Sequence, residues 1–191
     1  MRIISGFLKG KKMIFLKSAT TRPLRDFVKE SIFNVVTHSN LVDVSLDGAN
    51  VLDLYSGVGS FGIECISRGS KKTTFVENDK KALGVLKKNI EQLKIENRSS
   101  IFEAKISSFT KQLSEKNKYE IIFFDPPFSE NFFIKELKII KQASVCKKNH
   151  IIIIHRENKS KDDLSDLLDI FLTKKYGRSK VLFGSFNLNI A

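Results

Sequence analysis

The sequence has little cysteine, little proline and no long apolar run. Its two cysteines, Cys65 and Cys146, lie far apart and form no C-x-x-C pair, which argues against a disulfide scaffold and against a zinc site. The longest apolar runs, residues 121–124 and 151–154, are too short to cross a bilayer. The first residues show neither the apolar segment nor the cleavage site of an export signal. We therefore expect a reduced, cytoplasmic protein with no metal centre and no membrane partner.

The chain also lacks internal repeats, low-complexity tracts and linkers, and its three prolines occupy only two places, Pro23 and Pro126–Pro127. Its 191 residues are typical of one domain, at roughly 100 to 200 residues per domain. We expect a monomer that consists of an N-terminal extension, residues 1–40, and one catalytic-size domain, residues 41–191.

Positive charge is abundant. The chain has 33 basic and 21 acidic residues and a formal net charge of +12, which favours a polyanionic partner. A lysine bias of the genome would spread the excess evenly, yet residues 1–30 contain only two acidic side chains, Asp26 and Glu30, beside eight basic ones. We predict that this extension binds nucleic acid, with a merely solvated arm as the alternative. The predicted contacts are Arg2, Lys9, Lys11, Lys12, Arg22, Arg25 and Lys29.

The apolar pattern predicts the secondary structure. Residues 3–6 and 12–16 flank Gly6 and Gly10 and are typical of a small hairpin, and a helix is expected to begin at Pro23. The rest of the chain alternates between strands and helices. Strands are predicted at residues 51–55, 73–77, 100–104, 119–124 and 151–155, and helices at residues 60–68, 79–93, 107–113, 131–145 and 161–170.

This alternation predicts an α/β fold with a mostly parallel, doubly wound sheet and helices on both faces. Residues 171–176 and 180–189 are separated by Gly177 without an intervening helix. We therefore expect an antiparallel pair at the C-terminal edge. Ligands of such sheets bind beyond the carboxyl ends of the strands, so the loops there are the candidates for function.

The loop after the first predicted strand contains G-x-G-x-x-G, formed by Gly57, Gly59 and Gly62. Glu77 follows Gly57 at the spacing of about 20 residues that the dinucleotide fingerprint requires for an acid that binds ribose hydroxyls. The pattern alone fits both NAD and S-adenosylmethionine, since both contain an adenosine ribose. Asp53, just before the loop, favours S-adenosylmethionine, because a carboxylate suits a cationic amino acid better than a pyrophosphate.

The fourth predicted strand is followed by Asp125-Pro126-Pro127-Phe128. Two prolines fix the backbone, so the Asp125 carboxylate and the Pro126 carbonyl are expected to face one cleft as acceptors for the two hydrogens of an exocyclic amino group. Phe128 offers a ring on which a flipped base can stack.

These motifs resemble those of S-adenosylmethionine-dependent amino methyltransferases. The opening MRIISG with Lys9-Gly10-Lys11-Lys12, the segment from Arg22-Pro23 to Asn34 and the late Gly177-Arg178 resemble the RsmD type, the bacterial 16S ribosomal RNA (guanine-N2)-methyltransferases. The resemblance covers nearly the whole chain. It implies a Rossmann-like class I methyltransferase fold that methylates the 2-amino group of one guanosine, on ribosomal RNA, the small subunit or an assembly intermediate.

The resemblance also implies roles for individual residues. It places S-adenosylmethionine against Asp53, Tyr55, Gly57, Gly59 and Glu77, and the target base against Asp125, Pro126 and Phe128. Two departures from the family stand out. Lys105 lies where relatives carry an Asp or Asn that meets the adenine, which leaves the Ile106 amide for that contact, and Phe27 follows Asp26 where relatives carry an Arg.

Two other functions stay open. A DNA adenine or cytosine amino methyltransferase fits Asp125-Pro126-Pro127-Phe128 equally well, although the extension is short for a target-reading domain. A basic NAD-binding or RNA-binding module without catalysis would leave that motif unexplained. The histidines His38, His150 and His155 are scattered and are interpreted as structural or solvated, and Cys65 as a small core residue.

Overall fold

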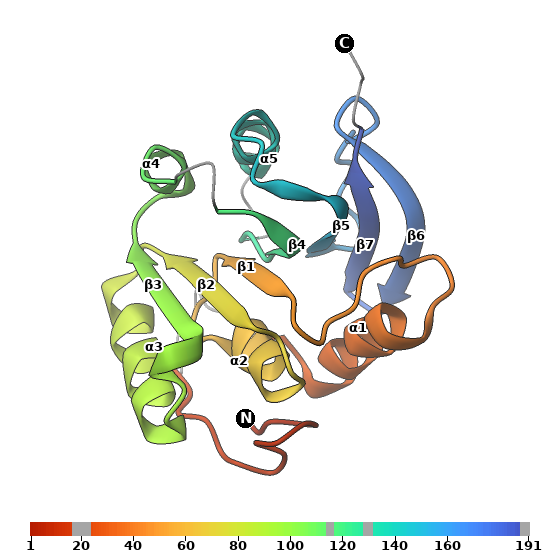
Figure 1. The fold of residues 1–191 in the computed structure, drawn as a ribbon. Coiled ribbons are helices and arrows are strands. Elements are labelled where there is room, and N and C mark those ends of the chain that lie inside the picture. The colour runs from red at the N-terminus through yellow and green to blue at the C-terminus, as the bar shows by residue number, and fades with distance from the viewer. Residues whose placement is uncertain (17–23, 114–116, 128–131, 188–191) are drawn as a thin grey trace.

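The computed structural model describes residues 1–16, 24–113, 117–127 and 132–187. Within them lies a seven-stranded sheet of order β3-β2-β1-β4-β5-β7-β6 (Figure 1). Its strands are β1 (Asn50–Leu54), β2 (Lys72–Glu77), β3 (Ser99–Glu103), β4 (Tyr119–Phe124), β5 (Cys146–Glu157), β6 (Leu168–Tyr176) and β7 (Ser179–Phe186). The first five are parallel, and β7 lies antiparallel between β5 and β6. The predicted doubly wound sheet with an antiparallel C-terminal edge pair is confirmed.

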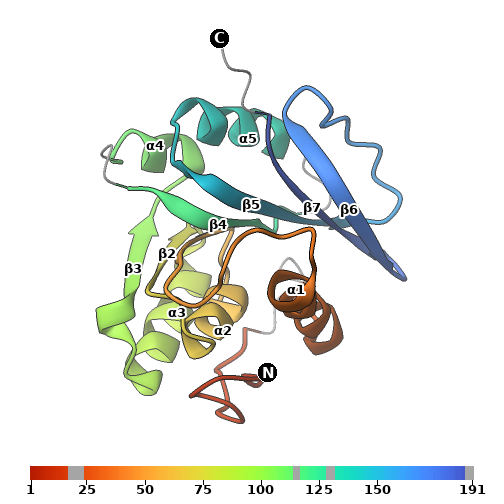
Figure 2. The same cartoon turned by 45° about the vertical axis from the view of Figure 1, so that its right-hand side comes forward.

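Helices cover both faces of the sheet (Figures 1 and 2). One face carries α1 (Asp26–His38), α2 (Ser60–Ser67) and α3 (Lys80–Leu93), and the other carries α4 (Ile106–Thr110) and α5 (Phe133–Gln142). Alternate residues of a strand point to opposite faces. In β4, Ile122 and Phe124 therefore pack with α4 and α5, while Ile121 and Phe123 pack with α1 and α2. Strands buried on both faces explain the continuous apolar runs in the sequence.

The N-terminal segment packs on α2 and α3. A single bridge joins Arg2 to Lys12, so the predicted hairpin has the expected pairing but forms no extended ladder. Its apolar side chains, Ile3, Leu8 and Met13, are buried against the two helices. The extension is therefore held by its side chains rather than by a sheet of its own.

Two helix predictions are wrong, one in its starting point and one in its existence. Helix α1 begins at Asp26, because Arg25 is extended (φ −64°, ψ 143°), and Pro23 lies outside the described residues. The helix predicted at residues 161–170 is replaced by turns and by β6 from Leu168. Arg156 binds the Asp162 side chain there, and Leu168 pairs with Phe186 of β7.

Candidate active site

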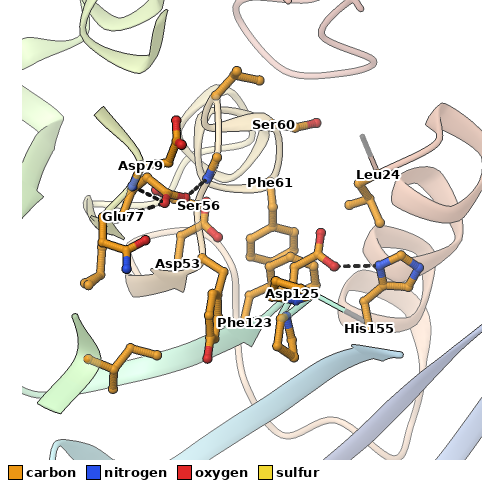
Figure 3. Close-up of a pocket in the computed structure, with 18 of the residues that line it drawn as sticks. Leu24, Asp53, Ser56, Ser60, Phe61, Glu77, Asp79, Phe123, Asp125 and His155 are labelled. Carbon is orange, nitrogen blue, oxygen red and sulfur yellow. Dashed lines mark hydrogen bonds and ion pairs between the residues drawn. The ribbon is translucent and has the colours of Figure 1, made fainter. Parts of the chain in front are cut away.

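A cleft of about 1140 Å³ opens at the carboxyl ends of β1, β2 and β4. The chain runs outward from β1 in both directions, to β2 and β3 on one side and to β4 and β5 on the other. This reversal point is where doubly wound sheets bind their ligands. Among the predicted site residues the cleft is lined by Asp53, Tyr55, Gly57, Glu77, Ile106, Asp125 and Pro126. Figure 3 labels Asp53, Glu77 and Asp125 among them. The structure thus brings the glycine loop and the Asp-Pro-Pro turn into one cavity.

The glycine loop depends on close approach of the backbone. Gly57 and Gly59 have φ of 55° and 87°, the left-handed region that glycine adopts without a steric penalty. A Cβ on Gly62 would lie 2.3 Å from the Phe75 ring and 2.9 Å from Oδ2 of Asp53. Gly62 therefore lets α2 pack directly on the sheet, which fixes the loop beside the cleft.

Asp53 anchors this loop through a hydrogen bond. Its side chain is buried, and Oδ2 accepts a hydrogen bond from the Gly62 amide at 2.9 Å. Burial raises the pKa of the Asp53 carboxyl well above its ordinary value, the Gly62 amide lowers it, and the charges of Asp125 and Glu77 raise it further. A buried carboxylate of this kind is stabilised by a cationic ligand group in the cleft.

Glu77 joins the glycine loop to the end of β2. Its Oε2 accepts from the Gly57 amide at 2.7 Å, and Oε1 accepts from the amides of Asn78 and Asp79 at 2.8 and 2.9 Å. These three bonds orient the carboxylate at the rim of the cleft. Two carboxylate oxygens provide about four acceptor positions, so one position remains for a ribose hydroxyl.

Two serine hydroxyls provide further polar groups in the cleft. Ser56 and Ser60 are buried, line the cavity, and have no hydrogen-bond partner for their Oγ atoms among the described residues. Buried polar groups without partners are rare in folded proteins. The two hydroxyls, the open space over Gly57 and the acids Asp53 and Glu77 suit a ligand with an amino acid end and a ribose, as in S-adenosylmethionine.

The opposite wall is formed by Tyr55 and the start of α4. Tyr55 has a φ of 60°, a strained conformation for a bulky residue, and its hydroxyl donates to Oε2 of Glu136. Burial raises the pKa of the Glu136 carboxyl. Ile106 is buried at the first position of α4, and Lys105 lies exposed beside it at the cleft. Both residues therefore line the cleft.

Asp125 has a partner that was missed in the sequence. Its Oδ1 lies 2.8 Å from Nδ1 of His155, and both side chains are mostly buried (Figure 3). Burial of His155 excludes the solvated alternative for this residue, and its side chain lines the cleft beside Asp125. The signal was the strand register. Phe124 pairs with Ile154, so Asp125, directly after the end of β4, lies beside His155 of β5.

The Asp-Pro-Pro turn is fixed by a buried arginine. Nη1 of Arg156 donates to the Pro127 carbonyl at 3.1 Å, and its Nε donates to Oδ2 of Asp162 at 3.0 Å. The guanidinium also lies over the Phe133 ring, 4.3 Å from its centroid. Phe128, predicted to stack on the base, lies outside the described residues.

The predicted RNA contacts divide into three groups. Arg2, Lys9, Lys11, Lys12 and Arg25 are exposed, as phosphate contacts must be. Arg22 lies outside the described residues. Lys29 is fully buried, so its prediction as an RNA contact is wrong. Its Nζ lies 3.3 Å from Oε2 of Glu64 and donates to the Arg2 carbonyl.

The extension is also joined to the glycine loop. Asn89 of α3 accepts from the Ile14 amide at 2.7 Å and donates to the carbonyls of Ile14 and Val58 at 3.1 and 3.0 Å. Met1, Phe15 and Leu16 line the cleft. Residues of the extension therefore form part of the wall of the site.

Comparison with known proteins agrees with this geometry. The family described as conserved hypothetical protein 95 matches residues 1–185. The ribosomal RNA small subunit methyltransferase D of Haemophilus influenzae is 33% identical over 82% of this chain and 79% of its own length. The protein of that name from Buchnera aphidicola (subsp. Acyrthosiphon pisum) is 34% identical over 82% of this chain and 78% of its own.

Two solved structures share the fold. A Haemophilus influenzae protein described as a candidate methylase has a TM-score of 0.76 and 27% identity, over 97% of this chain and 98% of its own. A Thermus protein of undefined function has a TM-score of 0.78 and 17% identity, over 96% and 98% of the two chains. The chain therefore belongs to the conserved hypothetical protein 95 family, together with the ribosomal RNA small subunit methyltransferases D.

Proposed function

We propose that this protein transfers a methyl group from S-adenosylmethionine to the exocyclic N2 of a guanosine in small-subunit ribosomal RNA. The observation that carries the proposal is a single cleft that contains both the glycine loop with Asp53 and Glu77 and the Asp125-Pro126 turn. A dinucleotide-binding module would need only the glycine loop with Asp53 and Glu77. An amino methyltransferase needs both, and family membership supports this choice.

The residues divide the work between binding and transfer. When bound, S-adenosylmethionine supplies a methyl group already activated by a sulfonium, so no covalent nucleophile is required of the protein. Glu77 holds the ribose and Asp53 faces the cationic amino acid end, with Ser56 and Ser60 as hydrogen-bonding groups between them. These contacts place the cofactor at the ends of β1 and β2.

Asp125 faces the amino group of the base. Its carboxylate and the Pro126 carbonyl accept the two N–H hydrogens, which orients the nitrogen lone pair toward the methyl carbon. As positive charge develops on the nitrogen, the negative charge of Asp125 stabilises it, and Asp125 or an adjacent water then removes the proton. The rate gain comes from positioning and from electrostatic complementarity to the transition state.

Recognition of the RNA belongs to the basic extension. We assign residues 1–40 to RNA contact and residues 41–191 to the methyltransferase domain, because Arg2, Lys9, Lys11, Lys12 and Arg25 are exposed on the extension. A structured RNA presents its own shape to the protein, so a compact enzyme needs no large reading domain. Ribosomal RNA as substrate implies a cytoplasmic protein, and no helix in the described residues could span a membrane.

A methylation assay tests the proposal directly. The protein is incubated with labelled S-adenosylmethionine and, in separate reactions, naked ribosomal RNA, small subunits and duplex DNA, and the modified nucleoside is identified. We expect N2-methylguanosine in the RNA or the subunit. Methyladenine or methylcytosine in DNA would support the DNA alternative, and binding of NAD in preference to S-adenosylmethionine would contradict both.

A further inference from the structure

The end of β5 holds the Asp-Pro-Pro turn from both faces of the sheet. His155 points to the face that carries α1 and α2, where its Nδ1 contacts Oδ1 of Asp125 at 2.8 Å. Arg156, the next residue, points to the face that carries α5 and donates to the Pro127 carbonyl. Two consecutive residues thus fix the first and the last residue of the turn.

The contact between His155 and Asp125 has a defined polarity. An ionised carboxylate only accepts hydrogen bonds, so Nδ1 of His155 carries the proton that Oδ1 receives. The His155 side chain is 8% exposed and therefore has few alternative orientations. A carboxylate held through Oδ1 is restricted in its rotation, which limits the directions that its second oxygen, Oδ2, can take relative to the cleft.

We propose that His155 is a positioning residue for methyl transfer, which holds the Asp125 carboxylate so that Oδ2 meets the amino group of the target base. The inference rests on the proposed function, because it assigns the orientation of a residue that this function uses. His155 touches neither the base nor the cofactor in this role. Its contribution appears in the rate of transfer and leaves cofactor binding unchanged.

The first test compares variants of His155 under single-turnover conditions with saturating S-adenosylmethionine and RNA. His155→Ala removes a hydrogen bond to a charged group, so the rate falls about 10- to 100-fold. His155→Asn places an N–H at the position of Nδ1 and restores the rate to within about threefold of wild type. Calorimetry with S-adenosylmethionine gives the same affinity for all three proteins.

His150 is the matched control. It is also buried on β5, with Nδ1 against the Lys147 carbonyl and Nε2 accepting from the Phe186 amide at 3.0 Å, and it does not line the cleft. His150→Gln keeps an acceptor near the Nε2 position and leaves the rate unchanged. A similar loss of rate in this variant would overturn the assignment, since it would show a general effect of altering β5.

A double-mutant cycle and nitrogen NMR separate this inference from the proposed function. If His155 acts through Asp125, adding His155→Ala to Asp125→Ala produces no further loss. In protein labelled with ¹⁵N-histidine, which has only three such residues, the Nδ1–H signal of His155 moves when Asp125 is replaced by Ala, even without substrate.

The outcomes are distinct. Full activity of Asp125→Ala would refute the mechanism proposed for the site. A slow Asp125→Ala protein beside a fully active His155→Ala protein would refute only the role of His155. Additive losses, or a His155→Ala defect that Asn does not restore in a protein with unchanged thermal unfolding, would also refute it.

Discussion

The Asp125 side chain provides both a hydrogen-bond acceptor and a negative charge, and two substitutions separate these contributions. Asp125→Ala removes the acceptor that faces the developing positive charge, so we expect transfer to slow by roughly 10² to 10³-fold, by analogy with the loss of an oxyanion-hole donor. Asp125→Asn keeps an acceptor oxygen without the charge. Single-turnover rates distinguish the cases: a slow Asn protein shows that charge matters, and a fast one shows that geometry suffices.

Glu77 is expected to contribute directly to cofactor affinity. Glu77→Ala removes the carboxylate that accepts a hydrogen bond from a ribose hydroxyl, which should weaken S-adenosylmethionine binding by about 1.5 to 3 kcal/mol. Calorimetry measures this change. Because Glu77 also accepts from the Gly57 amide, thermal unfolding of the same sample is needed as a control for the loop. Unchanged affinity would remove Glu77 from the site.

We expect Asp53 to lower the stability of the folded protein while it strengthens the binding of S-adenosylmethionine. Its carboxyl pKa is raised by burial, so the folded state binds the proton more tightly than the unfolded state does. Its contribution to stability is therefore most favourable below the ordinary pKa, and it is lost as the pH rises through the raised value. Asp53→Asn keeps an acceptor for the Gly62 amide and removes this loss.

We expect the Asp53→Asn protein to unfold at a higher temperature than wild type at pH 7, by about 2–4 °C per kcal/mol gained. The difference should largely disappear near pH 3.5, just below the ordinary pKa of an aspartate, where the wild-type carboxyl is mostly protonated in both states. S-adenosylmethionine should bind more weakly, because the charge opposite its cationic end is gone. Thermal unfolding at both pH values checks the first claim. A lower unfolding temperature at pH 7 would contradict it.

Site residues could be predicted from the sequence where their position at the end of a strand was enough to bring them to the site. Asp53, Glu77 and Asp125 each lie within one residue of the carboxyl end of a strand, and the carboxyl ends of parallel strands share one edge. His155 required the pairing of β4 with β5, which the alternation of strands and helices does not specify. Lys29 was misassigned because its charge is visible in the sequence, whereas the partner that buries it, Glu64, lies on another helix.

At the scale of elements, Glu64 of α2 fixes the extension to the domain. Its buried carboxylate accepts from the amides of Ile4 and Ser5, both at 2.9 Å, and pairs with Lys29 and Arg68. Lys29→Ala leaves this charge without one of its two cationic partners. Removing one member of a buried pair destabilises by about 3–5 kcal/mol.

We therefore expect Lys29→Ala to lower the free energy of unfolding by that amount, measured by urea denaturation. The salt dependence of RNA binding should stay as in wild type, because the side chain is buried. A reduced salt dependence in a stable Lys29→Ala protein would return Lys29 to the RNA interface.

The segment at residues 161–170 shows the limit of local pattern. Leucines at positions 164, 167 and 168 have helical spacing. All three are buried in the hydrophobic core that also contains the apolar residues of α5. A single turn satisfies that spacing, with the amides of Leu167 and Leu168 bonded to the Leu164 carbonyl. Pairing of Leu168 with β7 then prevails, because cross-strand contacts outweigh a weak helical preference.

For the whole molecule, the alternation of strand and helix was sufficient for the fold class and for the antiparallel edge. It was not sufficient for the strand order, since several orders satisfy the same alternation. The order matters for function, because it places β4 beside β1 and so brings Asp125 near Asp53. The site is thus a property of the sheet as much as of its motifs.

The charge of the whole chain leads to a prediction about RNA. Changing Lys9, Lys11 and Lys12 to Glu should weaken RNA binding and flatten its salt dependence, because each lost phosphate contact removes about 0.7 to 0.9 from the slope of log K against log salt. Titrations at several salt concentrations measure the slope. Affinity for S-adenosylmethionine should stay the same. An unaltered slope would mean that the extension is only solvated.

Through Asn89, hydrogen exchange at the Ile14 amide can report whether a ligand occupies the cleft. Its side-chain oxygen holds the Ile14 amide, and its side-chain nitrogen holds the Val58 carbonyl of the glycine loop. The Ile14 amide exchanges its hydrogen with solvent only when this bridge opens. Any ligand that steadies the loop slows that opening, so occupancy of the cleft can be read as slower exchange at a backbone position 75 residues away from Asn89 along the chain.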